Sequence, residues 1–240
     1  TNQWLTMENA FDSCINLEMQ AIDNPDLSLV TNMDFMFKDA AALDQSIDTW
    51  DVSNVISMKG LFQGCLNFNQ DLNSWNVSSV TDMNSLFKDA TNFNGNISSW
   101  DVSSVLDMDA MFFLTAFDQD ISTWQVDNVT SMQGTFNSTP FNQDINGWNV
   151  SSVTSMSALF QNCGSFNQNL NQWDVSSVEN MVVMFNSTPF NQDIESWDVG
   201  NVQNMNGMFL MSEFNQDLNG WNVSNVTDMA LMFAYSPFNK

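Results

Sequence analysis

Hydrophobic residues return in the same order about every 25 residues along the chain. Residues 75–99 hold one full repeat, in which Trp75 is followed by two valines, a Met-x-x-Leu-Phe cluster, a second Phe and an Ile. A Phe near the middle of each repeat, here called the central Phe, defines ten repeats: Phe11, Phe37, Phe62, Phe87, Phe112, Phe136, Phe160, Phe185, Phe209 and Phe233. A period of this size predicts stacked rungs, because one repeat is too short to bury its own apolar side chains and must be covered by its neighbours.

Each rung divides into three segments with different predicted backbones. Trp-x-Val-x-x-Val is rich in aromatic and β-branched residues, which favour an extended strand. In Asp82-Met-x-x-Leu-Phe87 the apolar residues stand at i, i+3 and i+4, a spacing that predicts one face of a short helix. The residue five before each central Phe is of a type that caps helix N-termini: Thr6, Asn32, Ser57, Asp82, Asp107, Ser131, Ser155, Asn180, Asn204 and Asp228. Phe-Asn-Gln-Asp-Ile, as at residues 141–145, predicts a second short strand.

Together these segments predict an α/β repeat: a solenoid of about ten rungs of 24–26 residues, with short parallel strands and one short helix per rung. One domain is expected over 1–240, with divergent rungs at 1–30 and regular repeats over 31–240. The last regular rung has no polar cap after it, so we expect either that a longer parent chain continues or that this end docks onto another subunit, the first being favoured. One cross-section of the core should bury Trp148, Val150, Val153, Met156, Phe160, Phe166 and Leu170.

Rungs differ by one residue in the stretch between the central Phe and the second Phe. Phe62 and Phe68 are six residues apart, whereas Phe136 and Phe141 are five apart with Pro140 between them. Pro189 and Pro237 occupy the equivalent place in other short rungs. Since proline disfavours helical backbone in the residue before it, we expect the predicted helix to end early in these rungs while the strands stay in register.

The run Phe-Asn-Gln-Asp-Ile-x-x-Trp-Asp-Val-Ser-x-Val-Thr-Asp-Met-x-x-Met-Phe resembles the bacterial surface protein repeat of about 25 residues, also known as DUF285 or the Mycoplasma-lipoprotein repeat. This resemblance covers about residues 27–240. Residues 10–17, Ala-Phe-Asp-Ser-Cys-Ile-Asn-Leu, resemble the related BspA type of leucine-rich repeat. The resemblance implies a leucine-rich-repeat-like solenoid on a cell-surface or secreted protein, often with a role in adhesion or partner binding. It implies neither a particular ligand nor any catalytic residue.

Charge narrows the range of partners. The formal net charge is −24, with 28 acidic residues, no His and only four cationic residues, all lysines. Nucleic acids and anionic membrane surfaces are bound through basic patches, so neither is an expected partner. No apolar run is long enough for direct insertion into a membrane. Without His or Arg, and with carboxylates spread along the chain, the sequence does not predict an enzyme.

Three cysteines occupy one position of the repeat, three residues after a central Phe: Cys14, Cys65 and Cys163. Cys14 and Cys65 are two rungs apart, which is about 10 Å at the spacing of stacked strands. A disulfide needs Cα atoms closer than about 7 Å. We therefore expect three buried thiols and neither a disulfide nor a zinc site.

Polar columns are the candidate binding surface. The residues assigned to it come from the Phe-Asn-Gln-Asp segments: Asn69, Gln70, Asp71, Gln119, Asp120, Gln143, Asp144, Gln192, Asp193, Gln216 and Asp217. A second column comes directly after the tryptophans: Asp51, Asn76, Asp101, Gln125, Asn149, Asp174, Asp198 and Asn222. One interpretation is that these side chains hydrogen-bond the backbone of turns. Oxygen-rich rows would also suit Ca²⁺, for example between Asp120 and Asp144, although no cofactor is required.

The function predicted from these features is a non-enzymatic binding scaffold, located outside the cell or on its surface, that recognises a protein or glycan on another cell or surface. The alternative is a structural rod or spacer that associates end to end in a surface layer or filament. Eight Asn-x-Ser/Thr sequons are either glycan acceptors or a by-product of the recurring repeat sequence that carries no glycan. They are Asn76, Asn96, Asn128, Asn137, Asn149, Asn186, Asn222 and Asn225.

Overall fold

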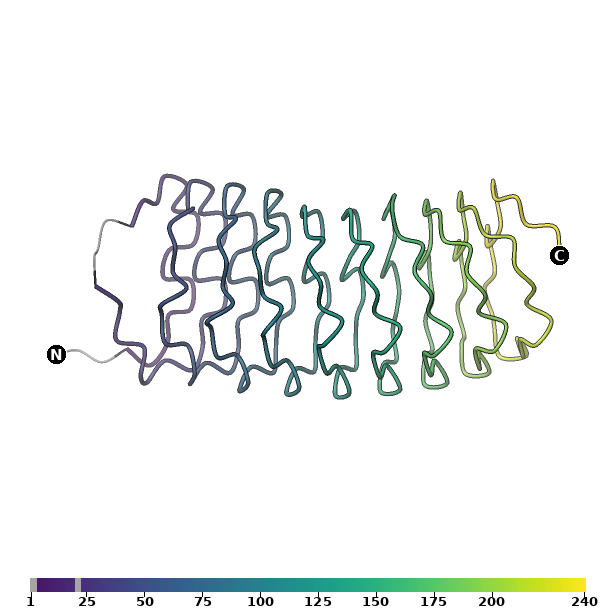
Figure 1. Ribbon diagram of the computed structural model, residues 1–240, viewed down its shortest axis with the longest axis horizontal. Helices are drawn as coiled ribbons and strands as arrows, with labels where there is room; N and C mark the ends of the chain where they lie inside the picture. The colour runs from purple at the N-terminus through teal and green to yellow at the C-terminus, as the bar shows by residue number, and fades with distance from the viewer. Residues whose placement is uncertain (1–3, 20–22) are drawn as a thin grey trace.

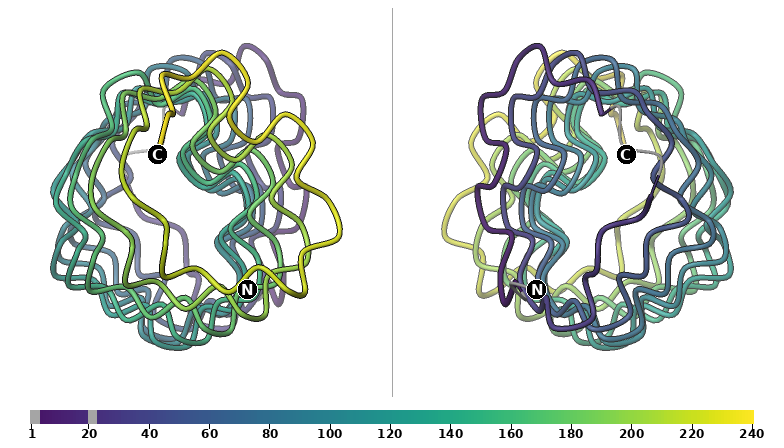
Figure 2. Two further views of the ribbon diagram at one scale, coloured as in Figure 1. Left: turned by 90° about the vertical axis from the view of Figure 1, so that its right-hand side faces the viewer. Right: turned by 90° about the vertical axis from the view of Figure 1, so that its left-hand side faces the viewer.

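The computed structural model of the chain describes residues 4–19 and 23–240. The chain winds as one elongated coil whose rungs succeed one another from the N-terminal to the C-terminal end (Figure 1). Seen from either end, the rungs overlap as similar outlines around a common interior (Figure 2). Neighbouring repeats in the sequence are therefore neighbours in space.

A ladder of single-residue parallel bridges connects the rungs. These bridges join Thr6 to Asn32, Asn32 to Ser57 and so on through Asp82, Asp107, Ser131, Ser155, Asn180, Asn204 and Asp228. Residues 4–19 and 23–240 contain no helix and no strand longer than one bridged residue. The predicted α/β solenoid, with a short helix and parallel strands in each rung, is therefore wrong.

A succession of β-turns replaces the predicted elements. In one rung, backbone N–H groups donate to the carbonyl three residues earlier in the pairs Leu72–Trp75, Val77–Val80, Met83–Leu86, Ser85–Lys88, Phe87–Ala90 and Ala90–Phe93. Five of these six turns begin and end on an apolar residue that is buried. The apolar-x-x-apolar spacing therefore marks turns whose two ends both point inward, which explains why Val-x-x-Val does not form a strand.

Left-handed backbone conformations prevent the predicted helix. Every described residue with positive φ lies two residues before or two residues after a central Phe, and 16 of these are not glycine. Around Phe87 they are Ser85, with φ 57°, and Asp89, with φ 61°. The Phe87 N–H donates to the Met111 carbonyl of the next rung, 2.9 Å away, and not to a carbonyl four residues earlier. A helix needs continuous right-handed φ and local i−4 bonds, and this segment has neither.

The predicted N-cap residues keep part of their expected role. The Asp82 carboxylate accepts the N–H of Asn84 at 2.9 Å, and the Asn204 side chain accepts the N–H of Asn206 at the same distance. Such a bond to the second following N–H occurs at a helix N-cap and equally in an Asx turn. Asp82 and Asn204 are therefore local acceptors, as predicted, but each opens a turn and not a helix. The prediction is wrong for the serines of this column: the Ser57 and Ser131 hydroxyls donate to a carboxylate, and the Ser155 hydroxyl has no partner among the described residues.

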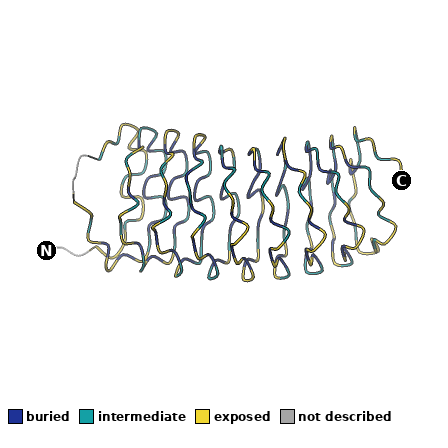
Figure 3. Cartoon of the chain, in the orientation of Figure 1, coloured by how far each residue is buried: buried dark blue, intermediate teal, exposed yellow. Residues whose placement is uncertain are grey.

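The interior is one hydrophobic cluster from Leu27 to Met232. The seven residues predicted for one cross-section are all buried, between 0 and 3% exposed, which confirms that prediction. Central phenylalanines stack from rung to rung, with ring centroids 5.7 Å apart between Phe136 and Phe160 and again between Phe160 and Phe185. Buried segments recur along the length of the coil (Figure 3).

Short and long rungs close the same turn in two ways. In long rungs the Phe93 N–H donates to the Ala90 carbonyl at 2.9 Å. In short rungs a buried hydroxyl takes that place: Thr139 Oγ1 donates to the Phe136 carbonyl at 2.7 Å and accepts the Phe141 N–H at 3.4 Å. The bridge ladder is continuous through both kinds of rung, so the missing residue does not shift the register.

The cysteine prediction is correct for two of the three thiols. All three cysteines are free, and Cys65 and Cys163 are buried. Cys14 is exposed, contrary to expectation, because no described rung covers the outer side of the first one. Burial raises the pKa of both Cys65 and Cys163 to about 12, so these thiols stay protonated at neutral pH.

Candidate polar binding surface

One side of the coil is held together by side-chain amides and carboxylates. The residue after each second Phe accepts the backbone N–H of the equivalent residue one rung later, as when the Asn94 N–H donates to Asn69 Oδ1 at 2.8 Å and the Asn191 N–H donates to Asn167 Oδ1 at 2.9 Å. The same bond repeats from Asp44 to Asn239 without a gap. This column, here named the Asn ladder, contains the predicted ligand residue Asn69.

The predicted glutamines reinforce the Asn ladder. Each donates from Nε2 to the ladder residue of the preceding rung: Gln143 reaches Asp118 Oδ1 at 2.9 Å, and Gln216 reaches Asn191 Oδ1 at 3.0 Å. Gln70, Gln119 and Gln192 make corresponding bonds to Asp44, Asn94 and Asn167. These side chains therefore stabilise contacts between rungs, and their amide nitrogens already have partners.

The predicted aspartates point outward from the same segments. Asp71, Asp120, Asp144, Asp193 and Asp217 are all exposed. Asp120, Asp144 and Asp193 each accept, through Oδ1, the N–H two residues later at 2.9–3.0 Å, while Asp71 accepts the N–H of Asn96 in the next rung at 2.8 Å. Hydrogen bonds from Ser122 lower the pKa of Asp120, first through its backbone N–H and then through its hydroxyl. The prediction that such side chains fix turn backbone is confirmed for Asp120, Asp144 and Asp193, whereas Asp71 connects two rungs.

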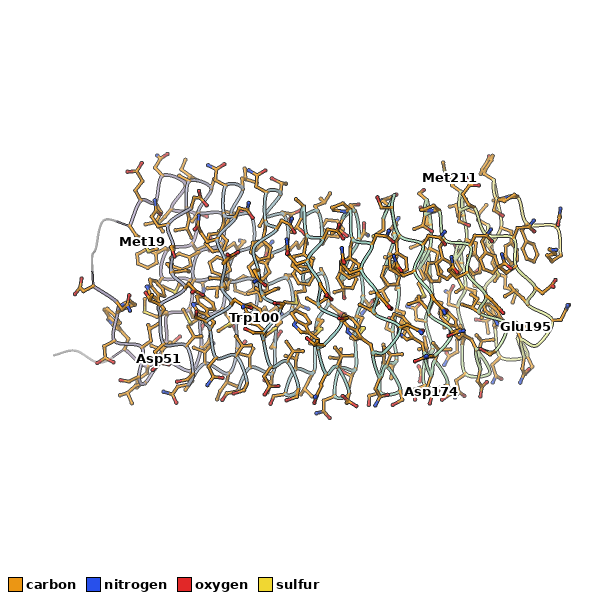
Figure 4. The ribbon with its side chains drawn as sticks, in the orientation of Figure 1. Met19, Asp51, Trp100, Asp174, Glu195 and Met211 are labelled. Atoms are coloured by element: carbon orange, nitrogen blue, oxygen red, sulfur yellow. The ribbon has the colours of Figure 1, made fainter. Side chains whose placement is uncertain are left out.

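The column after the tryptophans has the same construction. Asp51, Asp101 and Asp174 are exposed and accept the N–H two residues later at 3.0–3.1 Å. The hydroxyl and then the N–H of the following serine lower the pKa of all three, so they are ionised at neutral pH. Asn76 and Asn149 make the same turn with a neutral side chain. Asp51 and Asp174 both lie in the lower part of Figure 4, at different points along the coil.

Each Asx turn engages one oxygen of its carboxylate. For Asp51, Asp101 and Asp174 the bonds found among the described residues all end on Oδ1. A carboxylate has about four lone-pair sites, so each of these exposed residues keeps acceptor capacity for a partner. We name Asp51, Asp101 and Asp174, with the asparagines at their equivalent positions, the outer column.

Two half-buried carboxylates lie elsewhere, on the bridged side. Burial is the main cause that raises the pKa of Asp82 and of Asp109 above its ordinary value of 3.8. Asp109 accepts bonds from the Ser131 hydroxyl and from the Gln133 N–H at 2.7 Å. Within the described residues no group of three or more His, Cys, Asp or Glu side chains is arranged to hold a metal ion.

Sequence reasoning missed the role of the tryptophan nitrogens. From Trp75 onward each indole N–H donates to the carbonyl of an Ile or Leu in the preceding rung, as from Trp100 to Leu72 at 2.8 Å and from Trp197 to Leu170 at 3.0 Å. The regular Trp spacing could have predicted these bonds, because a buried indole usually finds an acceptor for its N–H. Trp100 is shown among its neighbours in Figure 4.

Two further expectations can be compared with the structure. The sequons at Asn137 and Asn186 are only 7% exposed, so these two side chains are shielded from a glycosylating enzyme in the folded chain. The part of the chain that is described holds no helix that could span a lipid bilayer. The remaining sequons and the location of the protein stay predictions.

Comparison with known proteins identifies one family. The family model described as "Mycoplasma protein of unknown function, DUF285" matches residues 5–116, 99–189 and 171–240, three overlapping segments that cover almost the whole chain. No curated protein and no solved structure was found to match. The further relation to BspA-type repeats, predicted from residues 10–17, stays a prediction.

Proposed function

This chain belongs to the DUF285 repeat family, and from that premise we propose that it is a non-enzymatic binding scaffold of a secreted or cell-surface protein, with an adhesion-type role. The observation that carries the proposal is the outer column. Its carboxylates repeat along the coil, remain exposed, and are held by Asx turns in a fixed direction. Groups fixed before binding lose less conformational entropy when a partner arrives.

The chemistry of the column selects the kind of partner. Ionised oxygens accept hydrogen bonds and attract cations, and the whole chain carries a net charge of −24. Supported partners are those rich in donors: glycan hydroxyls, or a protein surface that presents Lys or Arg. The Asn ladder and its glutamines serve the fold in this proposal, so the contact residues are the outer column and the exposed aspartates at 71, 120, 144, 193 and 217.

A substitution that the column already tolerates provides the test. Asp101→Asn with Asp174→Asn removes two charges but keeps an Oδ1 acceptor for each turn, as the native Asn76 and Asn149 do. Asn76→Asp is the matched control in the opposite direction, because the Asn76 side chain is bonded only through Oδ1 among the described residues. Wild type and both variants would be applied to a glycan array and to immobilised extracts of cell-surface proteins, each with Ca²⁺ and with a chelator.

The proposal predicts that the double variant weakens capture about tenfold, because bonds to charged groups are among the stronger ones, and that Asn76→Asp does not weaken it. Equal capture by wild type and double variant would contradict the role of the outer column. Absence of any captured partner in every arm would contradict the scaffold itself. Loss of capture only with the chelator would assign the contact to bridging Ca²⁺.

A structural rod is the second candidate, and the uninterrupted Asn ladder from Asp44 to Asn239 favours it. A coil that is hydrogen-bonded between all successive rungs resists bending. Light scattering over a range of concentrations separates the two proposals: reversible growth in mass without partner capture supports the rod, and a constant mass with partner capture supports the scaffold.

A further inference from the structure

A pocket of about 600 Å³ lies within the first two rungs. Its lining is mainly apolar and aromatic and includes Trp4, Phe11, Met19, Pro25 and Trp50. Met19 marks the N-terminal end of the coil in Figure 4. The volume is within the range of sites that hold small molecules, about 300–1,000 Å³.

An interruption of the Trp column accounts for the open volume. In regular rungs the indoles stack, with centroids 6.4 Å apart between Trp100 and Trp124 and 6.5 Å apart between Trp124 and Trp148. Pro25 stands where the rung before Trp50 would carry a tryptophan. Trp50 is consequently half-buried, whereas Trp75 is 3% exposed.

Leu17, a smaller side chain than the Phe of later rungs, lines the space, and its equivalent in the next rung, Leu43, is buried in the core. Leu17 and Leu43 hold the positions that later rungs fill with Phe68 and Phe93, whose rings stack at 6.1 Å. The first rungs therefore lack both an indole and aromatic rings that the rest of the coil uses to fill its interior.

One buried polar atom in the lining has no partner. Gln45 lines the pocket, and its Oε1 is buried without a hydrogen bond among the described residues. Later glutamines of the same column donate to the Asn ladder, and no oxygen of theirs is buried and unpaired. A buried acceptor without a donor is unfavourable, so a ligand N–H at this atom would relieve the penalty.

Two acidic residues complete the lining. Glu18 and Asp23 are the only charged groups of the pocket among the described residues. Pro25 and the aromatic residues make the lining largely apolar. A cation gains both from these carboxylates and from the faces of aromatic rings. We propose that this pocket binds a planar aromatic amine of about indole size, with its ring against Trp50 and an N–H donated to Gln45 Oε1.

Tryptamine is the probe, because it has an aromatic ring for the apolar lining, an N–H for Gln45 Oε1 and a positive charge for the two carboxylates. Isothermal titration of the full chain should show one site with a dissociation constant on the order of 0.1–1 mM, given the small number of ligand atoms. Indole-3-acetate keeps the ring and reverses the charge, and 2-cyclohexylethylamine keeps the charge and removes the aromatic ring. Both should bind at least about tenfold more weakly than tryptamine.

Two variants and a matched control locate the site. Pro25→Trp supplies the missing indole and should abolish tryptamine binding. Gln45→Met removes the acceptor at similar volume and should weaken binding about fivefold. Gln216→Met makes the same change in a rung far from the pocket and should leave binding unchanged.

Folding of each variant is checked by its melting curve before titration, and Gln45→Met decides the matter if Pro25→Trp does not fold. No saturable binding of tryptamine would overturn the proposal. Equal binding by wild type and Gln45→Met, or equal loss in Gln216→Met, would also overturn it. Because the outer column takes no part in this site, failure here leaves the capture experiment above unaffected.

Discussion

Two sides of the same coil are held together by different chemistry. On the bridged side, four backbone N–H groups of a rung donate to carbonyls of the next, as from Met58, Gly60, Phe62 and Gly64 at 2.8–3.0 Å. On the opposite stretch the Asn ladder and its glutamines connect the rungs through side chains. Backbone pairing places few demands on the outward side chains, whereas the Asn ladder requires Asn or Asp in every rung. The contrast explains why the outward residues of the bridged segment vary between rungs, whereas the Phe-Asn-Gln-Asp segment has nearly the same sequence in each rung.

The largest expected effect comes from the interior that both sides share. Phe160 is fully buried and stacks on Phe136, Phe166 and Phe185. Phe160→Ala should lower the free energy of unfolding by about 3–5 kcal/mol. Glu179→Ala, at an exposed position, is the control and should stay within about 0.5 kcal/mol. Denaturant unfolding measures both, and a loss under about 1 kcal/mol for Phe160→Ala would argue against a continuous packed interior.

A smaller effect distinguishes the two sides. Asn167→Ala removes the acceptor used by the Asn191 N–H and by Gln192 Nε2. The free energy of unfolding should fall by about 1–3 kcal/mol, because donors lose their partner. Asn171→Ala in the same rung is the matched control, since Asn171 is exposed and, among the described residues, only its backbone N–H is bonded. Equal stabilities of the two variants would show that the Asn ladder contributes nothing.

The smallest effect is a difference in pH dependence. Burial raises the pKa of Asp109, so its stabilising contribution is present below 3.8 and lost as pH rises through the folded-state pKa. Hydrogen bonds from the Ser103 hydroxyl and N–H lower the pKa of Asp101, so its contribution is present above 3.8 and lost on acidification. Relative to wild type, Asp109→Asn should therefore gain stability as the pH rises from about 3 to about 7, and Asp101→Asn should lose it. Melting temperatures across this range test the opposite signs, and parallel curves would contradict them.

The sequence revealed the repeat, the core and the register, because apolar spacing depends only on which residues face inward. It did not reveal the backbone that joins them. Met83, Leu86 and Phe87 face one side in a helix and equally in successive turns, so their spacing cannot separate the two. The residues that adopt left-handed backbone in these turns, such as Val183 at φ 48° and Leu114 at φ 57°, are of types that rarely do so, and the sequence therefore gives no local indication of the turns.

Predictions for the polar columns were limited for a related reason. Asp71 and Asp120 were assigned the same role because they hold the same place in the repeat, yet Asp71 accepts an N–H of the next rung and Asp120 accepts one of its own turn. Whether a side chain bonds its own turn or the next rung depends on the stacking distance, which the spacing of residues along one rung does not contain. The sequence could not predict that Gln45 Oε1 lacks a hydrogen-bond partner, for the same reason.

Hydrogen exchange in Asn167→Ala tests the central claim most directly, namely that side chains hold one side of the coil and backbone pairing holds the other. The Asn191 N–H donates to the Asn167 side chain, whereas the Phe185 N–H in the same rung donates to the Met208 carbonyl. The account predicts that protection of the Asn191 amide falls by about tenfold or more while that of Phe185 changes by less than about twofold. An equal loss at both amides, or an Asn191 amide that is unprotected in the wild type, would contradict it.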